Sequence, residues 1–490
     1  MANNVWDNSD ADNDGNNANN WSLGWVPKAG DTMYFDNTSD TDCTLSGNIS
    51  CDAVNVTSDY DGTLDLNGND LTTSGDMTFD GAGTVDCGEG VLTCSGHFDN
   101  QDQATWTYGT STVVLDGTAK NLTGSSAKDL YNLTIDGTIT IVAATTSGVD
   151  VHNDLVINNG KQITIDEQLR LVTGAVTNNG TIVCDDVLLL YGSTLTNSGT
   201  LSGTGTARIE SGSSVTGTGT WSVSNTHSKR DNTFDGTTGT TYGGTWLLQA
   251  DNGSRTLTLK GTITWSGDVT FDNDQGVTKT YTIDCSTHNP TLAFQGDLSL
   301  TATGGGAIDW GPGTGTITFS GSSNQSVDLN GDSVEDIVIN KSGGVITFTD
   351  DFTCDSFQAD AGDMDINGKT ITSEGNVDIN GGSAGAQFYD GAAHDMDNGK
   401  LICGSAGASA LTLDGDVGEQ LEIDNLDFDL QNASTGAATF CDVEDSDNAT
   451  GTIDATAASN NDNGNNTGWN FGAAGQTYRS SHVIGGGIVA

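Results

Sequence analysis

Short stretches in which apolar and polar residues alternate recur along the whole chain, as in residues 316–319 (TITF) and 133–135 (LTI). Alternation at every second position is typical of a strand that buries one of its faces. Turns rich in Gly, Asn, Asp and Ser separate these stretches, and no segment shows the apolar spacing of a convincing amphipathic helix. The pattern therefore predicts an all-β chain with many short strands.

The strongest pattern is an internal repeat with a period of about 20 residues. Residues 176–182 (VTNNGTI), 195–201 (LTNSGTL) and 215–221 (VTGTGTW) follow one another at offsets of 19 and 20. A looser member, residues 157–163 (INNGKQI), lies one such period before the first. Each segment has an apolar residue, a polar turn that contains Gly, and a second apolar residue six positions later.

A period of this length fits one coil of two or three short strands joined by tight turns. Such a coil cannot bury its apolar side alone, but stacked coils pair their strands in parallel and close a continuous core. We therefore expect a β-solenoid, a right-handed parallel β-helix with coils of about 20 residues. Ile157, Val176, Leu195 and Val215 should point inward and lie directly above one another. A string of β-sandwiches is the alternative fold, and it would show no sustained echo of this length.

The repeat divides the chain into three parts. Residues 1–34 are an opening segment and cap rich in Asp and Asn, residues 35–472 are the β-solenoid, and residues 473–490 are an apolar, nearly uncharged tail. Because the tail would be sticky if it were exposed, we expect it to dock on a neighbouring chain or particle.

Composition narrows the range of partners. The chain has 66 acidic and 15 basic residues, and its formal net charge is −51. Such a charge repels phosphates and argues against nucleic acid as a partner. A transmembrane helix needs about 20 apolar residues in succession, and no run approaches this length, so we expect no membrane insertion. The 67 Gly and only 3 Pro suit a stack of strands, since Pro would remove one ladder hydrogen bond in each coil.

The nine cysteines are widely spaced and odd in number, and several occupy apolar strand positions, as Cys184 does. We interpret them as small buried hydrophobic residues in a reduced protein. Pairing of Cys43 with Cys51, or of Cys87 with Cys94, stays open.

Asp10, Asp12 and Asp14 have the alternating spacing of a calcium loop. The bidentate Glu that an EF-hand needs at its twelfth position is replaced by Trp21, which excludes an EF-hand. Two interpretations remain open, a solvated acidic cap and a looser calcium site.

Catalytic patterns are weak, and we expect neither an enzyme nor an organic cofactor. Paired Asp residues are too common to be informative, and no HExxH or Walker motif occurs. His227, Lys229 and Arg230 form the one compact basic cluster, which we interpret as an exposed loop. Aromatic pairs could stack on sugar rings or pack in the core, and we favour packing; the pairs are Trp106 with Tyr108 and Tyr242 with Trp246.

Three segments resemble surface β-solenoids of bacteria and their phages: residues 19–35, residues 316–347 and residues 465–471. The resemblance covers most of the chain and implies a phage fibre, a spike or an adhesin. The amino terminus does not have the basic start and apolar stretch of a signal peptide. We therefore expect a non-enzymatic virion protein that is made in the host cytoplasm and used for display or attachment.

The expected partners are other virion proteins and further copies of the chain, for which a trimer is plausible, with a host-surface glycan as a further candidate. The alternatives are a secreted, extracellular adhesin and a spike that degrades polysaccharide.

Overall fold

The computed structural model describes residues 2–125, 127–143, 148–380, 387–389, 399–414, 421–424, 426–439, 441–444, 446–457, 460–464 and 466–472. The predicted docking tail, residues 473–490, lies outside the described residues.

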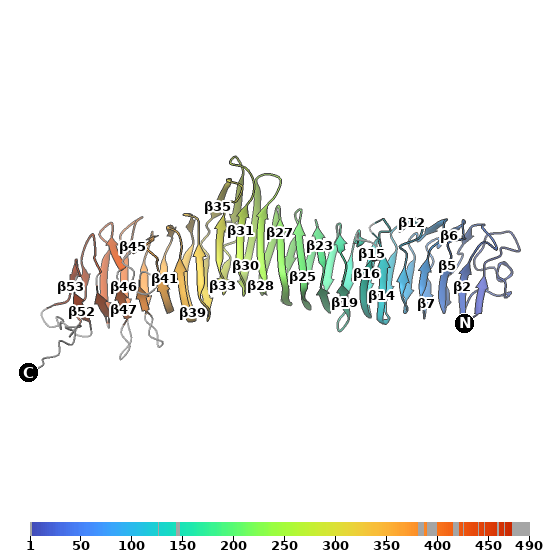
Figure 1. The fold of residues 1–490 in the computed structure, drawn as a ribbon, viewed down its shortest axis with the longest axis horizontal. Helices are drawn as coiled ribbons and strands as arrows, with labels where there is room; N and C mark the ends of the chain where they lie inside the picture. Colours follow the sequence, from blue (N-terminus) through green and yellow to red (C-terminus); the bar gives the residue numbers. More distant parts are fainter. Residues whose placement is uncertain are drawn as a thin grey trace, which may run out of the picture. The chain divides into compact units, whose positions relative to one another are not determined.

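The prediction of an all-β solenoid is confirmed. Strands account for 57% of the chain and helix for 1%, and parallel strands stack as a β-solenoid of about 18 turns with about 21 residues per turn (Figure 1). The alternative of a string of β-sandwiches is wrong, because the paired strands run parallel rather than antiparallel. Among the described residues, no helix is long and apolar enough to cross a membrane.

The chain forms two compact units, Met1–Thr245 and Trp246–Ala490. The strands of the first unit are β1 (Ala2–Val5), β2 (Asp31–Phe35), β3 (Cys43–Thr44), β4 (Ile49–Cys51), β5 (Ala53–Val56), β6 (Thr63–Asp65), β7 (Leu71–Thr73), β8 (Met77–Phe79), β9 (Thr84–Asp86), β10 (Val91–Cys94), β11 (Phe98–Asp99), β12 (Thr105–Thr107), β13 (Thr112–Leu115), β14 (Thr118–Gly124), β15 (Asn132–Ile135), β16 (Thr138–Ala143), β17 (Val149–Val151), β18 (Leu155–Ile157), β19 (Gln162–Ile165), β20 (Leu169–Leu171), β21 (Ala175–Asn178), β22 (Thr181–Cys184), β23 (Val187–Tyr191), β24 (Thr194–Asn197), β25 (Thr200–Glu210), β26 (Ser214–Thr216), β27 (Thr220–Lys229) and β28 (Asn232–Tyr242).

The strands that follow are β29 (Thr245–Ala250), β30 (Arg255–Trp265), β31 (Val269–Asn273), β32 (Thr280–Asp284), β33 (Thr291–Phe294), β34 (Leu298–Thr301), β35 (Ala307–Gly311), β36 (Thr316–Gly321), β37 (Gln325–Asp328), β38 (Ser333–Val334), β39 (Asp336–Phe348), β40 (Phe352–Cys354), β41 (Phe357–Asp365), β42 (Thr370–Ser373), β43 (Val377–Asn380), β44 (Gln387–Tyr389), β45 (Gly399–Cys403), β46 (Ala410–Asp414), β47 (Leu421–Asp424), β48 (Leu426–Leu430), β49 (Thr435–Thr439), β50 (Cys441–Glu444), β51 (Ile453–Asp454), β52 (Asn461–Gly464) and β53 (Trp469–Asn470).

Each coil of the regular part of the first unit contains three strand segments that enclose a common core. In the coil formed by β21, β22 and β23, each strand pairs in parallel with the matching strand of the next coil. The inward side chains are apolar and fully or almost fully buried, as Val176, Ile182 and Leu188 are. Alternation along each strand therefore sends one set of side chains into the core and the other to the surface.

The predicted stacking of the repeat is largely confirmed. Val176, Leu195 and Val215 are register partners and are buried. Ile157 is also buried, but its predicted place in the column is wrong, because Leu155 pairs with Val176.

The cause of this error is a longer turn. Residues 158–161 separate β18 from β19, whereas only residues 179–180 separate β21 from β22. The segment 157–163 therefore matches the repeat only after the turn, where Ile163 pairs with Ile182. Before the turn it is out of register.

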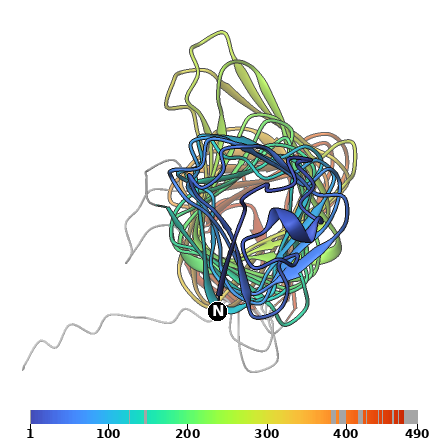
Figure 2. The same ribbon diagram turned by 90° about the vertical axis from the view of Figure 1, so that its right-hand side faces the viewer.

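Aromatic side chains cover the first coil of the first unit. β1 pairs in parallel with β2, so parallel stacking already begins within the predicted opening segment. Trp6 and Trp21 are buried with their ring centroids 5.2 Å apart, and Trp21 lies 5.7 Å from Phe35. Figure 2 shows this first coil in dark blue, together with the short 3-10 helix Ala18–Asn20. These buried rings fill the core of the first coil.

Two groups of coils differ in length. In residues 155–221, the short coils, Val176 pairs with Leu195 and Leu195 with Val215, a spacing close to the average turn of about 21 residues. In residues 246–327, the long coils of the second unit, Val269 is the register partner of Leu298, so a single coil reaches from one to the other. The additional residues lie in turns, and Figure 1 shows the segment around β35 extending beyond its neighbours in the second unit.

Candidate functional site

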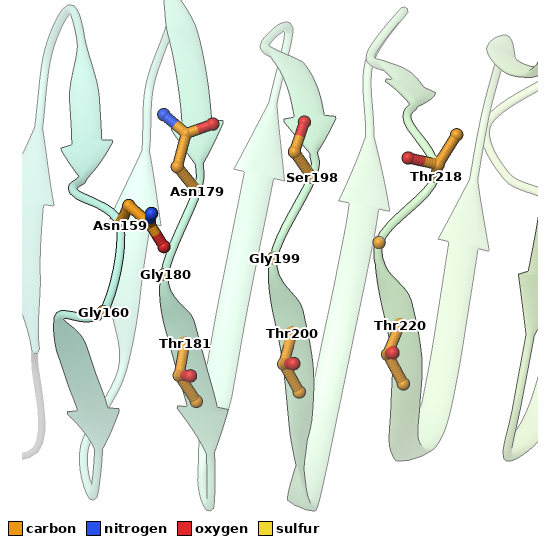
Figure 3. Close-up of a pocket in the computed structure, with 11 residues that line it drawn as sticks. Asn159, Gly160, Asn179, Gly180, Thr181, Ser198, Gly199, Thr200, Thr218 and Thr220 are labelled. Carbon is orange, nitrogen blue, oxygen red and sulfur yellow. The ribbon is translucent and has the colours of Figure 1, made fainter.

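An open groove of about 450 Å³ follows one corner of the short coils (Figure 3). Its lining consists of matching turn residues from successive coils. Thr181, Thr200 and Thr220 are register partners, and Figure 3 shows their side chains in a row. The lining residues are all neutral, so the groove presents hydroxyl, amide and backbone groups.

A column of glycines forms the floor of this groove because a side chain has no space there. A Cβ atom on Gly199 would lie 2.0 Å from the carbonyl oxygen of Gly180, and one on Gly219 would lie 2.2 Å from that of Gly199. Contacts this short are not tolerated, so each coil can approach the previous one only through a glycine.

Two buried asparagines hold the turns from inside. The Asn178 side-chain amide donates to Asn197 Oδ1 at 2.7 Å and to the Thr200 carbonyl oxygen at 3.0 Å. The Asn197 amide donates in turn to the carbonyl oxygen of Thr220 at 3.1 Å. These asparagines thus form the buried ladder that like residues in a stack can make, and they satisfy backbone groups that would otherwise be unpaired.

Chemically more varied side chains gather on the outer face near β17 and β20. His152 Nε2 lies 2.7 Å from Asp129 Oδ2, and an Arg170 guanidinium nitrogen lies 3.0 Å from Asp150 Oδ2. Leu130 pairs with Val151, which places Asp129 beside Asp150 in adjacent coils. The Tyr108 ring stacks on the His152 ring with the centroids 5.1 Å apart, and on the Tyr131 ring at 6.2 Å.

Burial makes Asp150 a stronger proton-binding group than an exposed Asp. The Asp150 side chain is only 5% exposed. Burial raises the pKa of Asp150 to about 6, and the Asp129 carboxylate adds to this effect while Arg170 and His152 oppose it. Asp150 therefore takes up a proton at a higher pH than an exposed Asp does.

We missed this cluster in the sequence, since its members lie one coil apart and look isolated in the chain. Asp129, Asp150 and Arg170 occupy one outward column of successive coils. Writing the sequence in rows of one coil length would have brought them into a column.

The basic cluster at residues 227–230 is not an exposed loop, and that interpretation is wrong. His227 and Lys229 belong to β27, where the side chains of Thr226 and Ser228 point inward and are buried. Arg230 follows the strand with a positive φ of 70°. The polar composition of β27 concealed a strand, because hydroxyl side chains replace apolar ones on its inner face.

Arg230 folds back over the face of the solenoid. Its Cζ atom lies 5.9 Å from the centroid of the Tyr191 ring, and its Nη1 donates to Ser211 Oγ at 2.7 Å. The Tyr191 side chain is among the few large apolar groups exposed in the described part of the chain.

The candidate calcium ligands lie in the loop that precedes Trp21, and their oxygens accept hydrogen bonds from the protein. Asn17 donates to Asp10 and Asp12 at 3.1 and 2.8 Å, and Ser46 donates to Asp14 at 2.7 Å. No group of three or more His, Cys, Asp or Glu side chains is arranged to hold a metal ion among the described residues. The calcium site at Asp10, Asp12 and Asp14 stays a prediction.

The interpretation of the cysteines as small buried residues is confirmed, since all nine are buried. None of them forms a disulfide in the structure. Burial raises the pKa of the Cys184 thiol to about 11, which keeps the thiol protonated and unreactive at neutral pH.

The core-packing interpretation of the aromatic pairs is confirmed for three of the four residues. Trp106 is buried, and its ring packs 5.3 Å from that of Phe79. Tyr242 and Trp246 are also buried. Tyr108 alone among the four reaches the outer face, where it stacks on His152.

Comparison with known proteins gives no relative. No protein-family profile matches the chain, and no curated protein or solved structure is similar to it.

Proposed function

We propose that the chain is a non-enzymatic structural protein of a phage virion, a fibre, spike or decoration protein that serves display or attachment. The observation that carries this proposal is the stacking of one coil on the next. The inward side chains are buried in the core, and the outward ones form regular columns. A surface of this kind supports presentation of a repeated pattern rather than enclosure of a substrate.

Two further observations support the proposal. The corner groove has a neutral lining, so its residues offer hydrogen bonds but no acid–base chemistry. The segments that resemble phage and bacterial surface solenoids include residues 19–35, which the structure folds around the first coil. In this proposal the chain assembles with other virion proteins, with further copies of itself as a homo-oligomer such as a trimer, and with a host-surface glycan.

Labelling of purified particles tests the proposal. Antibodies raised against the folded chain should decorate intact phage particles in electron micrographs, and mass spectrometry of density-purified particles should recover its peptides. Recovery of the chain from the culture medium or cell surface, without particles, would favour an adhesin instead. Release of reducing ends from host polysaccharide by the purified protein would show that it is an enzyme.

A further inference from the structure

Basic and aromatic side chains concentrate on one outer face of the first unit. Asp150, Arg170, Leu189, Arg208 and His227 are successive register partners on neighbouring coils. A second column beside it contains Tyr191, Glu210 and Lys229. We call these eight residues, together with Arg230, the arginine strip.

The strip reverses the charge balance of the chain. Its four permanent cations (Arg170, Arg208, Lys229 and Arg230) outnumber its two carboxylates, Asp150 and Glu210, in a chain whose net charge is −51. Asp129 adds a third carboxylate where the column continues beyond Asp150. The strip also holds three of the five arginines of the sequence. Because charges beyond about 8–10 Å are screened at physiological ionic strength, a ligand on the strip experiences mainly the charges of the strip and of the carboxylates directly beside it, Asp129 among them.

Two guanidinium groups on the strip keep unused hydrogen-bonding capacity. Arg170 contacts Asp150 through one nitrogen at 3.0 Å, and Arg208 contacts Glu210 through one nitrogen at 2.5 Å. The two arginine side chains are 40% and 38% exposed, so N–H groups beyond these contacts can reach a ligand from solvent. A guanidinium with available donors binds carboxylates in a bidentate, planar arrangement that Lys cannot reproduce.

The residue between these two arginines in the register is apolar and almost fully buried, and an aromatic side chain lies beside it on the surface. Leu189 separates Arg170 from Arg208 in the register and is only 8% exposed. Tyr191 follows on the same strand with an exposed fraction of 40%. An aromatic ring beside hydrogen-bond donors suits a sugar, which presents C–H groups on one face and polar groups at its rim.

From this geometry we propose that the arginine strip binds a linear glycan that carries one carboxylate in each disaccharide repeat. Arg170 and Arg208 are two coils apart, about 10 Å at the spacing of β-strands, which is the scale of a disaccharide repeat. Each arginine would take one carboxylate, and the sugar between them would lie on Leu189 and beside Tyr191. Nucleic acid fits less well, because its denser phosphates would meet the acidic surface beyond the strip.

This inference rests on the proposed attachment function and names its partner. Isothermal titration with a hyaluronan octasaccharide, which alternates a uronic acid with a neutral sugar, provides the direct measurement. We expect the full chain to bind this octasaccharide and to bind its carboxyl-reduced form at least ten times more weakly. Equal affinity for the two forms, or no binding of either, would overturn the inference.

Variants locate the site without unfolding the chain. The double variant R170K/R208K keeps both positive charges beside Asp150 and Glu210 but removes the planar forks. We expect it to bind the octasaccharide at least tenfold more weakly than the wild type, with an unchanged circular dichroism spectrum. The charge variant K260Q, in the second unit, should bind like the wild type. Unchanged affinity of R170K/R208K would contradict the assignment of the site.

A second copy of this acidic chain is the competing occupant of the strip. Light scattering decides between the glycan and a second copy. If the strip is an interface between copies, the wild type is a dimer, R170K/R208K is a monomer, and the octasaccharide does not change the mass of the dimer. That result would overturn the glycan assignment. If the chain binds the octasaccharide but is missing from purified particles, the glycan site is supported and the virion proposal is refuted. If the chain is present in particles but does not bind the octasaccharide, only the glycan site is refuted.

Discussion

The short coils of residues 155–221 and the long coils of residues 246–327 solve the same packing problem in different ways. In the short coils, a glycine recurs in the turn from coil to coil, and a buried asparagine occupies two successive turns, so these turns are supported by their copies. In the long coils, the extra turn residues are held individually. Asn273 donates to the carbonyl oxygens of Ala307 and Lys279, and Asp272 accepts from Thr303.

This difference shows that the core and the turns obey separate constraints. Leu195 and Leu298 both lie in stacked inward columns and are both buried, although one belongs to a short coil and the other to a long coil. Coil length can therefore vary wherever a turn finds its own hydrogen bonds, while the inward columns stay continuous.

The largest expected effect comes from a charge in the core, which should affect both kinds of coil equally. We expect L195D and L298D each to lower the free energy of unfolding by about 3–5 kcal/mol, because each buries an unpaired carboxylate. Denaturant titration measures this loss, and T196D, at an exposed neighbouring position, is the control. A mild effect of L298D alone would show that the long coils have a looser core.

Substitution of a turn glycine should lower stability in the short coils but not in the long coils. In G199A the new methyl group would collide with the Gly180 carbonyl oxygen, and we expect a loss of about 2–3 kcal/mol. Gly276, in a turn of the long coils, has open space around it and no positive φ, so G276A should change stability by less than about 0.5 kcal/mol. Equal losses in the two variants would refute the role assigned to the glycine column.

Asparagines test whether neighbouring turns are coupled. Removal of the Asn197 side chain leaves Asn178 without one acceptor, so N197A should cost about 1–2 kcal/mol. The double variant N178A/N197A should lose less than the sum of the two single variants, with a coupling energy of about 0.5–1.5 kcal/mol. N178A combined with N273A should be additive, since Asn273 and Asn178 share no hydrogen-bond partner. Additivity in both pairs would argue against a ladder.

The smallest expected effect concerns pH and one carboxyl in each unit, the buried Asp150 and the half-buried Asp332. Burial raises the pKa of both Asp150 and Asp332 to about 6, compared with 3.8 in the unfolded chain. The folded chain then binds these protons more tightly. Their stabilising contribution is complete below pH 3.8 and is lost as the pH rises through 6. We expect a loss on the order of 1 kcal/mol for each group between pH 4 and pH 7.

Thermal unfolding between pH 4 and pH 7 measures this slope. The variants D150N and D332N should each reduce it, and the double variant should reduce it most. An unchanged slope in both single variants would mean that the two carboxyls are ionised throughout this range.

The regular part of the fold was predictable from the sequence because one segment, with inward apolar residues at fixed spacing, repeats in successive coils. Val176, Leu195 and Val215 share a turn of constant length, so their spacing directly gives the coil length. Ile157 was misplaced because the longer turn after it shifts the register. A comparison at a fixed offset of 19 or 20 residues does not detect such a shift.

The surface clusters were less predictable. Asp129 and Asp150 meet only through the stacking of coils, and their pairing depends on a register that the sequence alone does not fix. His227 and Lys229 were assigned to a loop because β27 is rich in Ser and Thr, which are typical of turns. The assignment failed because hydroxyl groups with buried hydrogen-bond partners occupy inward positions of this strand.

The parallel register has a consequence for synthesis. Paired strands in both groups of coils are separated in the chain by only a single coil, so each new coil emerges from the ribosome beside the one on which it packs. The coil that contains Trp6, Trp21 and Phe35 emerges before the coils that follow it, and its strand β2 offers a paired edge to β5. Folding can thus advance with translation from one coil to the next, and only the most recent strand presents an unpaired edge to other growing chains.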